Sequence, residues 1–499
     1  YLTESSKSPA SIAQSNKHKL RSQALSAKLQ GWIANICFDL NYGRNEIMAN
    51  TGQSHALDMT KGSPMRLLMQ FSLPLFFGNL LQQCYNLADT AIAGHLLGDA
   101  ALAQIGATAA LYSLIMNFAF GLNNGMALTV SRSFGAGDEK KMRQATCWMV
   151  TLAVAWSLLL TVVFLGIRRP LLGWLQVPAE TLDGALQYLT VILAGIPLTM
   201  AYNLESAMLQ SVGDSMLPLR LLLFSSVLNI GLDFLFMGPL GLGVRGAAIA
   251  TVASQGISAG LGAYMVVKQH PELHFSREDR KTKPGFVREL LATGLSMAMM
   301  STLYNLGSVI MQGSINALGT VYIAAQVGGR RLAELFYIPG LALGTGTATY
   351  ASQNYGAGKN TRITRGIRVA ILLYGIWWLF ALVFEILGAS QAVRMITGSD
   401  SREVIENATR YLQVSIPMMP PMGVLIIVRN ALQGMRHTLA PLFCSALELI
   451  GKVIFALWII PVKGYFAVCI CEPVTWVICC AFILVALYRF RGDLQADVA

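Results

Sequence analysis

The sequence predicts an all-α polytopic membrane protein, with twelve transmembrane helices in two six-helix lobes related by a parallel pseudo-two-fold repeat. Three observations lead to this prediction: the composition, a series of long apolar stretches, and motifs of the first half that recur in the second. The 499 residues are 54% hydrophobic and only 13% charged. That composition is far more apolar than a soluble chain of this length requires, and it is typical of membrane proteins.

Backbone motifs of the first half recur in the same order in the second half. Residues 133–137 (SFGAG) return as residues 354–358 (NYGAG), at an offset of 221 positions. Gln210, in the motif AMLQ, returns as Gln433, in NALQ, at an offset of 223. A drift of two residues over half of the chain indicates a nearly gap-free duplication. We therefore expect both halves to carry the same helices.

Twelve stretches are long and apolar enough to cross a bilayer, whose hydrocarbon core of about 30 Å takes about 20 helical residues. They cover residues 66–94, 101–130, 144–167, 184–210, 216–238, 244–267, 286–316, 321–350, 366–388, 411–428, 438–461 and 464–488. The duplication divides them into an N-lobe at 59–267 and a C-lobe at 286–490. A hydrophilic linker at 268–285 joins the lobes, and a tail follows at 491–499.

Because six is an even number, both lobes enter the membrane from the same side, which makes the repeat parallel. Most Lys and Arg residues fall in the loops on the side of the N-terminus. The opposite loops hold only Arg168, Arg169, Arg245, Arg394, Arg402, Arg410 and Lys463. The positive-inside bias therefore predicts that both termini are cytoplasmic. This bias and a basic N-terminal tail account for the net charge of +11 without a nucleic-acid partner.

The first residues differ sharply from the rest of the chain. Residues 1–58 are polar and rich in Ser, Lys, Gln and Asn, which is typical of a disordered segment. They contain no signal-peptide pattern, and they do not begin with Met. We expect an extension that is not native coding sequence, with the true start at Met48 or Met59.

Two sets of potential metal ligands are better explained without a metal. His270 and His274 lie four residues apart in the linker, but Pro271 between them breaks the helix that such a pair requires. We therefore expect a solvated linker. The cysteines of residues 469–480 lie in an apolar span, where small packing residues are commoner than metal ligands.

A few polar or charged side chains fall inside the spans of the N-lobe, where each needs a partner or a function. Asp89 lies in the first span and Thr251 in the sixth, while Asn229 and Asp233 lie four apart in the fifth and so share one helix face. At about 1.5 Å per residue from the outer end of each span, all four lie about 8 to 13 Å deep. We predict that they form one site.

Two carboxylates, an amide oxygen and a hydroxyl at one depth suit either of two cations. They supply the oxygen ligands and negative charge that Na⁺ prefers. They also suit a proton, because two neighbouring carboxylates in a low dielectric cannot both ionise comfortably. The alternative is a buried hydrogen-bond network that only holds the first, fifth and sixth spans together.

The C-lobe carries different charges. Glu448 and Lys452 lie four apart in the eleventh span, so they can neutralise each other on one helix face. We interpret them as a structural ion pair, with a contact to substrate as the alternative. Three further acids lie in or near spans and have no assigned role: Glu334, Glu385 and Glu472. Arg330 or Arg331 could pair with Glu334.

Proline residues interrupt two spans at matching positions of the repeat. Pro197 lies in the fourth span, and Pro417, Pro420 and Pro421 lie in the tenth. Since proline removes a helical hydrogen bond, we expect bends at both places.

Together, the parallel halves of six spans, the motif LADT that contains Asp89, and the Gly-Ala-Gly turn after the second span of each lobe resemble the multidrug and toxic compound extrusion (MATE) family over residues 62–490. The resemblance implies a V-shaped pair of lobes that alternately face each side of the membrane. It also implies export of organic cations and other amphipathic drugs, driven by inward flow of Na⁺ or H⁺.

Within the family, the N-lobe cation site of the DinF-like branch is similar to Asp89, Asn229, Asp233 and Thr251. The NorM-like branch instead has acids in the seventh and tenth spans. This chain has Ser301, Thr302 and Asn305 in the seventh span and no carboxylate in the core of the tenth. The resemblance therefore favours the DinF-like or a related branch, with coupling in the N-lobe.

We therefore expect an antiporter of the bacterial inner membrane, coupled to H⁺ or Na⁺, that acts as a monomer without a cofactor or a metal other than Na⁺. The alternative is a flippase for a lipid-linked saccharide or another lipid precursor, of the same superfamily, which would show several Arg facing the central cleft. A membrane-embedded enzyme would need a nucleophile with a base, or metal ligands, at membrane depth. The spans contain no such group, so we predict that the protein is not an enzyme.

Overall fold

The computed structural model describes residues 56–175, 177–398, 401–495 and 497. Residues 56–499 form one compact unit, and the described residues contain helices and no strand. The expected extension up to residue 55, including Met48, lies outside the described residues. The first seven helices make up the N-lobe: α2 (Pro64–Leu97), α3 (Asp99–Gly135), α4 (Glu139–Trp174), α5 (Ala179–Ala194), α6 (Ile196–Ser211), α7 (Met216–Met237) and α8 (Gly243–Gln269).

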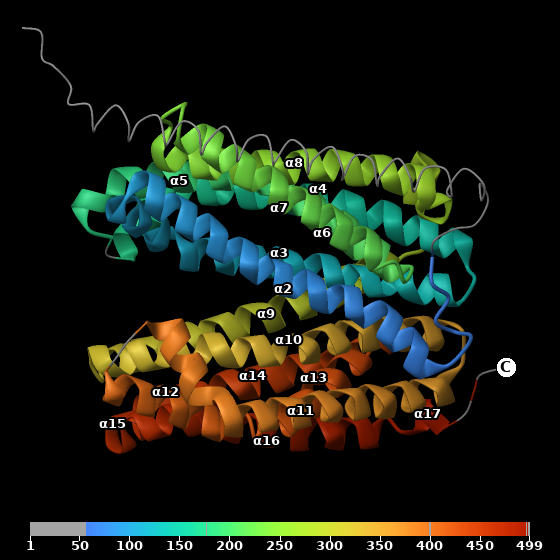
Figure 1. Ribbon diagram of the computed structural model, residues 1–499. Helices are drawn as coiled ribbons and strands as arrows, with labels where there is room; N and C mark the ends of the chain where they lie inside the picture. Colours follow the sequence, from blue (N-terminus) through green and yellow to red (C-terminus); the bar gives the residue numbers. More distant parts are fainter. Residues whose placement is uncertain (1–55, 176, 399–400, 496, 498–499) are drawn as a thin grey trace, which may run out of the picture. The chain divides into compact units, whose positions relative to one another are not determined.

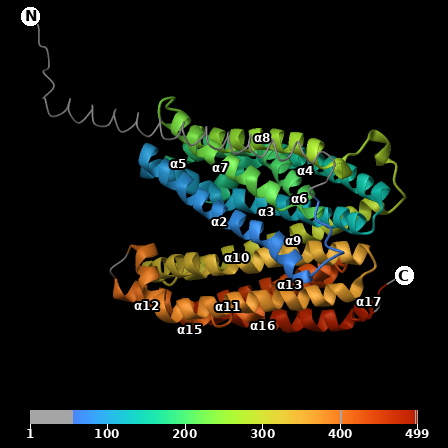
Figure 2. The same cartoon turned by 45° about the vertical axis from the view of Figure 1, so that its right-hand side comes forward.

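Two short 3₁₀ helices, η1 (Pro271–Leu273) and η2 (Arg277–Arg280), lead to the C-lobe. Figures 1 and 2 show its helices gathered on one side of the unit and the N-lobe on the other. The C-lobe comprises α9 (Phe286–Asn316), α10 (Thr320–Gly356), α11 (Asn360–Thr397), α12 (Arg402–Ser415), α13 (Met419–Gly434), α14 (Leu439–Ile454), a π-helical turn η3 (Phe455–Ile459), α15 (Ile460–Lys463) and α16 (Tyr465–Arg489). A last short helix, α17, covers Gly492–Gln495.

The helices account for the twelve predicted spans, six in each lobe. Seven of them are apolar and long enough to cross a membrane on composition alone, and two bent pairs raise that number to nine. The other three are α2, α9 and α10, which have 34, 31 and 37 residues. They are long enough to span a bilayer, although they are less apolar, and all three take part in the packing between the lobes.

The predicted proline bends are confirmed. The axes of α5 and α6 differ by 48°, and those of α12 and α13 by 54°. In both pairs, proline stands in the first turn of the second helix, with Pro197 in α6 and Pro420 in α13. A proline in that position loses no hydrogen bond, because the first N–H groups of a helix have no partner within the helix.

The lobes meet through reciprocal helix pairs. The first helix of each lobe packs on the second helix of the other, so that α9 lies against α3 and α2 lies against α10. Glycines allow the close approach: a Cβ on Gly125 would lie 2.5 Å from the Thr293 carbonyl oxygen, and at Gly346 it would overlap Ser72. These two contacts correspond under the repeat, because Gly346 lies 221 positions after Gly125 and Thr293 lies 221 positions after Ser72.

The repeated glycine motif packs across the same boundary. A Cβ on Gly135 would overlap the backbone of Gln353, and a Cβ on Gly356 would overlap the backbone of Arg132. Two hydrogen bonds beside them are also related by the repeat: Ser131 Oγ donates to the Thr349 carbonyl at 3.4 Å, and Ser352 Oγ donates to the Leu128 carbonyl at 2.7 Å. The motif therefore recurs in both lobes because each copy packs on the other.

The end of the unit where this motif lies is called the basic end, after Arg132, Lys359, Arg362 and Arg436. An ion pair joins the lobes there, with Arg132 Nη2 3.6 Å from the carboxylate of Glu289. Within the C-lobe, Arg436 Nη2 lies 2.6 Å from the same carboxylate. Buried Arg132 also donates to the Gly434 carbonyl at 3.4 Å. The basic end is thus closed between the lobes by backbone contact and by charge.

The chain before α2 lies across the basic end. The Leu57 N–H donates to the Val212 carbonyl of the N-lobe at 2.9 Å. Two residues further on, the N–H of the fully buried Met59 donates to Gln353 Oε1 of the C-lobe at 2.8 Å. Arg362 Nη2 donates to the Met59 carbonyl at 3.3 Å. This segment therefore bonds to both lobes.

The linker is not solvated throughout, and for His270 that expectation was wrong. The His270 side chain is fully buried, with Nε2 3.2 Å from Asp214 Oδ2 and Nδ1 2.8 Å from Glu272 Oε1. Asp214 in turn accepts hydrogen bonds from the Met216 and Leu217 N–H groups at the start of α7. The linker is thus anchored to the N-lobe by a histidine between two acids.

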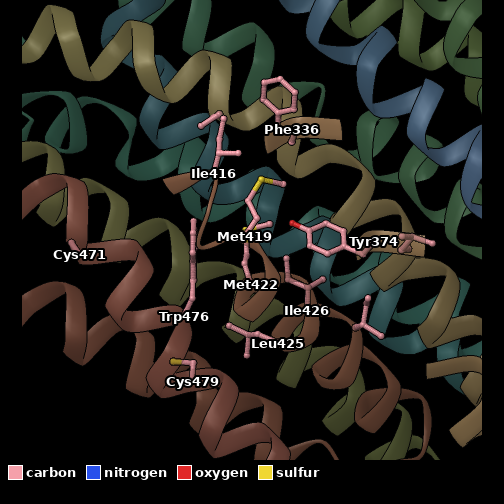
Figure 3. Packing of buried hydrophobic residues seen from close by; sticks show 14 of the residues in the cluster. Phe336, Tyr374, Ile416, Met419, Met422, Leu425, Ile426, Cys471, Trp476 and Cys479 are labelled. Carbon is pink, nitrogen blue, oxygen red and sulfur yellow. The ribbon is translucent and has the colours of Figure 1, made fainter. Parts of the chain in front are cut away.

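The C-lobe has a continuous apolar core. Met419, Met422 and Leu425 of α13 pack with Trp476 of α16 and Phe336 of α10, and all five are at most 7% exposed. Figure 3 shows these side chains gathered where α13 begins, directly after the proline bend. Here methionine fills an ordinary core, as its flexible side chain allows.

Replacement of Gly356 by leucine tests the packing between the lobes. The added side chain overlaps the Arg132 backbone, so the lobes must separate or distort, and overpacking of this kind costs about 1–3 kcal/mol. We expect a lower melting temperature in detergent, measured by intrinsic fluorescence. Gly375→Leu is the control, because no atom lies within 4 Å of its Cβ position. Equal melting temperatures for the two variants would contradict the packing argument.

His270 predicts a pH dependence of stability. Burial opposes protonation, but the hydrogen bonds to Asp214 and Glu272 outweigh it and raise the pKa of His270 to about 9. Its pKa in the unfolded chain is about 6.5, so its contribution is complete below that pH and is lost as the pH rises through 9. We expect the melting temperature of the wild type to fall more between pH 7 and 9.5 than that of His270→Gln. Parallel pH profiles would show that the pair of acids does not hold the charged form.

Candidate functional site

Three helices of the N-lobe bring the four predicted residues together. Asp89 comes from α2, Asn229 and Asp233 come from α7, and Thr251 comes from α8. Helix α7 packs against both α2 and α8, and the four-residue spacing in α7 places Asn229 and Asp233 on the face between them. Both are at most 1% exposed, Thr251 is 9% exposed, and Asp89 is half-buried.

Hydrogen bonds connect the four residues. With its amide oriented to match its neighbours, Asn229 donates to Asp233 Oδ2 at 2.8 Å and accepts from the Thr251 N–H at 3.2 Å. The side chains of Asp89 and Asp233 lie within hydrogen-bonding range of each other. Two carboxyl groups can share a hydrogen bond only if one of them carries a proton. The geometry therefore suits a pair of acids that binds and releases one proton or one other monovalent cation.

The two acids have no basic partner. In the part of the chain that the structure describes, neither Asp89 nor Asp233 forms an ion pair with Lys, Arg or His. No N–H or O–H group of another described residue donates to one buried oxygen of each carboxyl group, Oδ1 in both cases. Buried acceptors without partners are costly, so both oxygens are suited to receive a cation.

An apolar cluster separates the site from the nearer end of the unit. One turn beyond Asp89, Asp233 and Thr251, in the direction of that end, lie Ala93, Met237 and Ala247. All three belong to one buried cluster and are at most 4% exposed. Because this cluster excludes water and lowers the local dielectric, the charge on the acids has a strong effect on their surroundings.

Two tyrosines were missed by the sequence reasoning. The Tyr85 hydroxyl of α2 lies within hydrogen-bonding range of Thr251. Tyr188 of α5, which is 9% exposed, belongs to the apolar cluster next to the site. Tyr85 could have been found from the sequence, because it precedes Asp89 by four residues and so shares its helix face. Nothing in the sequence links α5 to the site.

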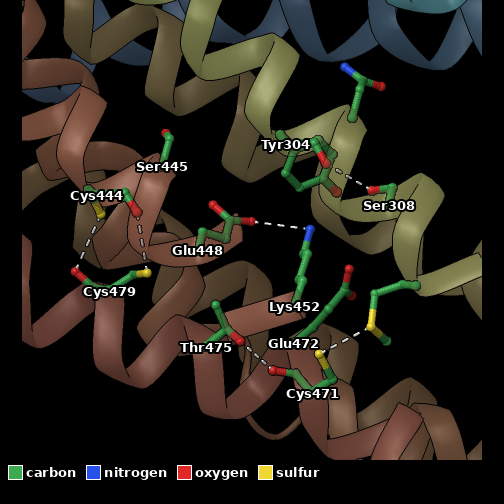
Figure 4. A network of polar contacts seen from close by, with 12 residues as sticks. Tyr304, Ser308, Cys444, Ser445, Glu448, Lys452, Cys471, Glu472, Thr475 and Cys479 are labelled. Carbon is green, nitrogen blue, oxygen red and sulfur yellow. Dashed lines mark hydrogen bonds and ion pairs between the residues drawn. The ribbon is translucent and has the colours of Figure 1, made fainter. Parts of the chain in front are cut away.

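In the C-lobe, Glu448 and Lys452 do form an ion pair. Lys452 Nζ lies 3.4 Å from Glu448 Oε1, and Arg429 Nη1 lies 3.6 Å from Glu448 Oε2. The Lys452 ammonium also stands 4.1 Å from the ring centroid of Tyr304. Figure 4 shows Lys452 between Glu448 and Glu472, with Tyr304 facing it from α9.

A second set of contacts continues this network. Arg330 Nε lies 2.8 Å from Glu334, as expected from their spacing, and Arg330 Nη1 lies 3.4 Å from Glu472. The Tyr411 hydroxyl donates to Glu472 at 3.1 Å. Three bases thus meet three acids, and the network is neutral as a whole. Glu385 lies apart from it in α11 and forms no ion pair with any described residue.

A pocket lies between the lobes. Phe120 and Asn124 of α3 and Gln210 of α6 line it from the N-lobe, and Met297 of α9 and Thr345 of α10 line it from the C-lobe. Among the described residues, no Lys, Arg, Asp or Glu lines this pocket. It is therefore an apolar and weakly polar surface shared by both lobes.

Comparison with known proteins identifies the family. The model of the MatE family matches residues 74–235 and again residues 296–458, which together make up more than half of the chain. The chain belongs to the MatE family. The two matches begin 222 positions apart, in agreement with the repeat, and the expected MATE membership is confirmed. The protein is therefore a multi-pass membrane transporter and not an enzyme.

Individual relatives agree with this membership. The chain is 30% identical over 311 residues to the probable multidrug resistance protein YpnP of Bacillus subtilis, which covers 62% of this chain and 69% of the relative. It is 24% identical to the probable multidrug resistance protein NorM of Thermotoga maritima, over 77% of this chain and 82% of the relative. A crystal structure of MATE in complex with MaL6 has the same fold, with a TM-score of 0.82 at 21% identity, covering 89% of this chain and all of the other.

Loss of Lys452 tests the role of the C-lobe ion pair. In Lys452→Met, the buried Glu448 keeps only Arg429, and breaking a buried pair of this kind costs about 3–5 kcal/mol. We expect a clearly lower melting temperature for Lys452→Met. Adding Glu448→Gln to this variant should lower the melting temperature by less than Glu448→Gln lowers it in the wild type. A role in substrate binding would instead leave the melting temperature unchanged and raise the KM of transport.

Proposed function

We propose that the protein is an antiporter that exports organic cations and amphipathic drugs in exchange for H⁺ or Na⁺, with the coupling cation bound at Asp89 and Asp233. The observation that carries this proposal is the pair of neighbouring acids without a basic partner, each with a buried oxygen to which no other described residue donates a hydrogen bond. An acid pair that only held helices together would be expected to have its charge and its acceptors satisfied. In the C-lobe network three bases balance the charge of three acids, whereas the N-lobe site contains two acids and no base among the described residues.

The helix α2 connects the acids to the boundary between the lobes. Its second half carries Asp89 and packs on α7, while its first half packs on α10 and α11 of the C-lobe, as Figures 1 and 2 also show. Phe76 of α2 contacts Trp377 of α11 with ring centroids 6.0 Å apart. Pro74 stands inside α2, between its start and Asp89. Binding of a cation at Asp89 bends or shifts α2 near Pro74 and so changes the contacts between the lobes.

Two observations support a drug as the exported substrate. The names of the relatives in Bacillus subtilis and Thermotoga maritima refer to multidrug resistance. The pocket between the lobes offers aromatic, methionine and small polar side chains, which suit varied amphipathic molecules. A flippase for lipid-linked saccharides would need cationic groups for the phosphates of its substrate, and the lining of this pocket includes none among the described residues.

The geometry favours a proton as the coupling ion. The Asn229 side-chain oxygen accepts the Thr251 N–H, so it is less available as a ligand for Na⁺. The proximity of Asp89 to Asp233, by contrast, suits one shared proton. Binding of the proton and binding of the drug then oppose each other, because linkage requires each to change the affinity for the other by the same factor.

The proposal includes a location and an orientation. The excess of Lys and Arg at the basic end supports a cytoplasmic position for that end and for both termini, in the bacterial inner membrane. The site at Asp89 then lies nearer the outer surface. The protein acts as a monomer, since one chain contains both lobes and the pocket between them.

Replacement of Asp89 tests the coupling role. Asp89→Asn keeps the size of the side chain but cannot take up a proton, so we expect it to abolish ethidium efflux from energised cells at normal expression. The matched control is Asp99→Asn, an exposed residue at the start of α3, which should transport as the wild type does. Normal efflux by Asp89→Asn would refute the mechanism.

Ion gradients imposed on proteoliposomes identify the coupling ion. We expect a pH gradient alone to drive ethidium movement by the wild type, and a Na⁺ gradient alone to have no effect. Movement driven by Na⁺ at uniform pH would name Na⁺ instead. If neither gradient drives movement, the protein is not a cation-coupled antiporter.

A further inference from the structure

A group of arginines lies at the end of the N-lobe that is opposite the basic end, and nothing in the proposed transport cycle uses it. Arg168 and Arg169 of α4 and Arg245 of α8 line one pocket of about 560 Å³. Helix α5 supplies another side of the pocket with Gln187 and Thr190. Helix α5 packs on both α4 and α8, and Figure 1 shows α5 and α8 close together there.

The arginines are not neutralised by the protein. No ion pair joins any of the three guanidinium groups to a carboxylate within the described residues, and Arg168 Nη1 donates only to the Leu165 carbonyl of its own helix. The acids of α5, Glu180 and Asp183, do not line the pocket. The pocket therefore carries a local excess of three positive charges.

The backbone adds to this positive charge. Arg245 is the third residue of α8, a helix of 27 residues. Its N-cap, Leu242, makes no side-chain cap hydrogen bond, so the first N–H groups of the helix remain available. These groups and the helix dipole favour an anion at this end. The dipole and the arginines thus act in the same direction.

The position of these arginines runs against the distribution of charge in the rest of the chain. Only seven Lys or Arg residues fall in the loops opposite the basic end, and three of the seven line this one pocket. Positive charge on that side opposes the positive-inside bias. Its concentration at one place therefore points to a ligand rather than to topology.

The surface beside the pocket is apolar and exposed. On α4, Val162 is 71% exposed, Ile167 is 41% exposed and Trp174, at the end of the helix, is 84% exposed. Such a surface faces lipid, and tryptophan is typical of the boundary between lipid and water. Leu186 and Ile249 continue this apolar surface into the pocket. A ligand that combines an anionic group with acyl chains fits both parts.

We infer that this pocket binds a phosphate group, held by the guanidinium groups of Arg168, Arg169 and Arg245 at the N-terminus of α8. Arginine suits phosphate because its planar fork donates two parallel hydrogen bonds. The group can come from the head group of an anionic phospholipid or from a soluble phosphate ester. The placement of this pocket at the outer leaflet rests on the proposed orientation of the protein. The chemistry of phosphate binding does not depend on that orientation.

Native mass spectrometry of the purified full chain tests this site. The probes are phosphatidylglycerol, zwitterionic phosphatidylcholine, and glycerol phosphate as a soluble competitor. The variant is the triple substitution Arg168→Gln, Arg169→Gln and Arg245→Gln. The control is Arg394→Gln, Arg402→Gln and Arg410→Gln, which removes the same charge from exposed residues on the same side of the C-lobe.

We expect the N-lobe triple variant to bind phosphatidylglycerol at least about tenfold more weakly than the wild type, since it lacks all three charged hydrogen-bond donors. The control variant should bind it as the wild type does, and phosphatidylcholine binding should not change. Displacement by glycerol phosphate would identify a soluble ester as a ligand, and its failure would identify the lipid. If the triple variant does not fold, Arg245→Gln alone should still weaken binding severalfold.

Equal loss of phosphatidylglycerol in the two triple variants would overturn the inference, and so would unchanged binding in the N-lobe variant. The readout is independent of transport, since it needs neither an ion gradient nor a drug. If the antiport proposal fails, the phosphate site is therefore unaffected. If the phosphate site fails, the antiport proposal is unaffected.

Discussion

One electrostatic constraint underlies the proposed mechanism of this transporter. Two carboxyl groups, Asp89 and Asp233, adjoin each other in an apolar lobe without a basic partner. Such a pair is unstable with both charges present and is stabilised when a cation or a proton neutralises one of them. The surrounding apolar cluster strengthens this effect by excluding water. In the mechanism that we propose, the rest of the lobe responds to the occupancy of this site by a cation.

In the proposed mechanism, the packing of the lobes couples cation binding at the acids to the pocket between the lobes. Helix α2 carries Asp89, yet its first half packs on the C-lobe, because the duplicated fold places the first helix of each lobe against the second helix of the other. Gly125 and Gly346 permit this close packing. In the proposed mechanism, a change at the acids therefore alters a contact between the lobes without a separate relay. The charged network of the C-lobe is not an equivalent site, since its three acids, Glu334, Glu448 and Glu472, meet three bases.

Much of the fold could be predicted because its signals are local or repeated. The span count followed from the duplication even where α2, α9 and α10 are less apolar, and the shared face of Asn229 and Asp233 followed from helix periodicity. Contacts between distant segments could not be predicted in the same way. The meeting of Gly135 with Gln353, the pair Arg330–Glu472 and the place of Tyr188 in the apolar cluster next to the site depend on tertiary packing. The burial of His270 was missed because its acidic partner Asp214 lies 56 residues away.

The most direct test of the central claim is the number of protons released when an organic cation binds to the purified protein in weakly buffered detergent solution. If drug and proton compete for a state set by Asp89 and Asp233, binding of tetraphenylphosphonium releases about one proton per wild-type molecule. The same binding to Asp89→Asn then releases none. Drug binding to the wild type without proton release, at saturating drug and without Na⁺, would contradict the account.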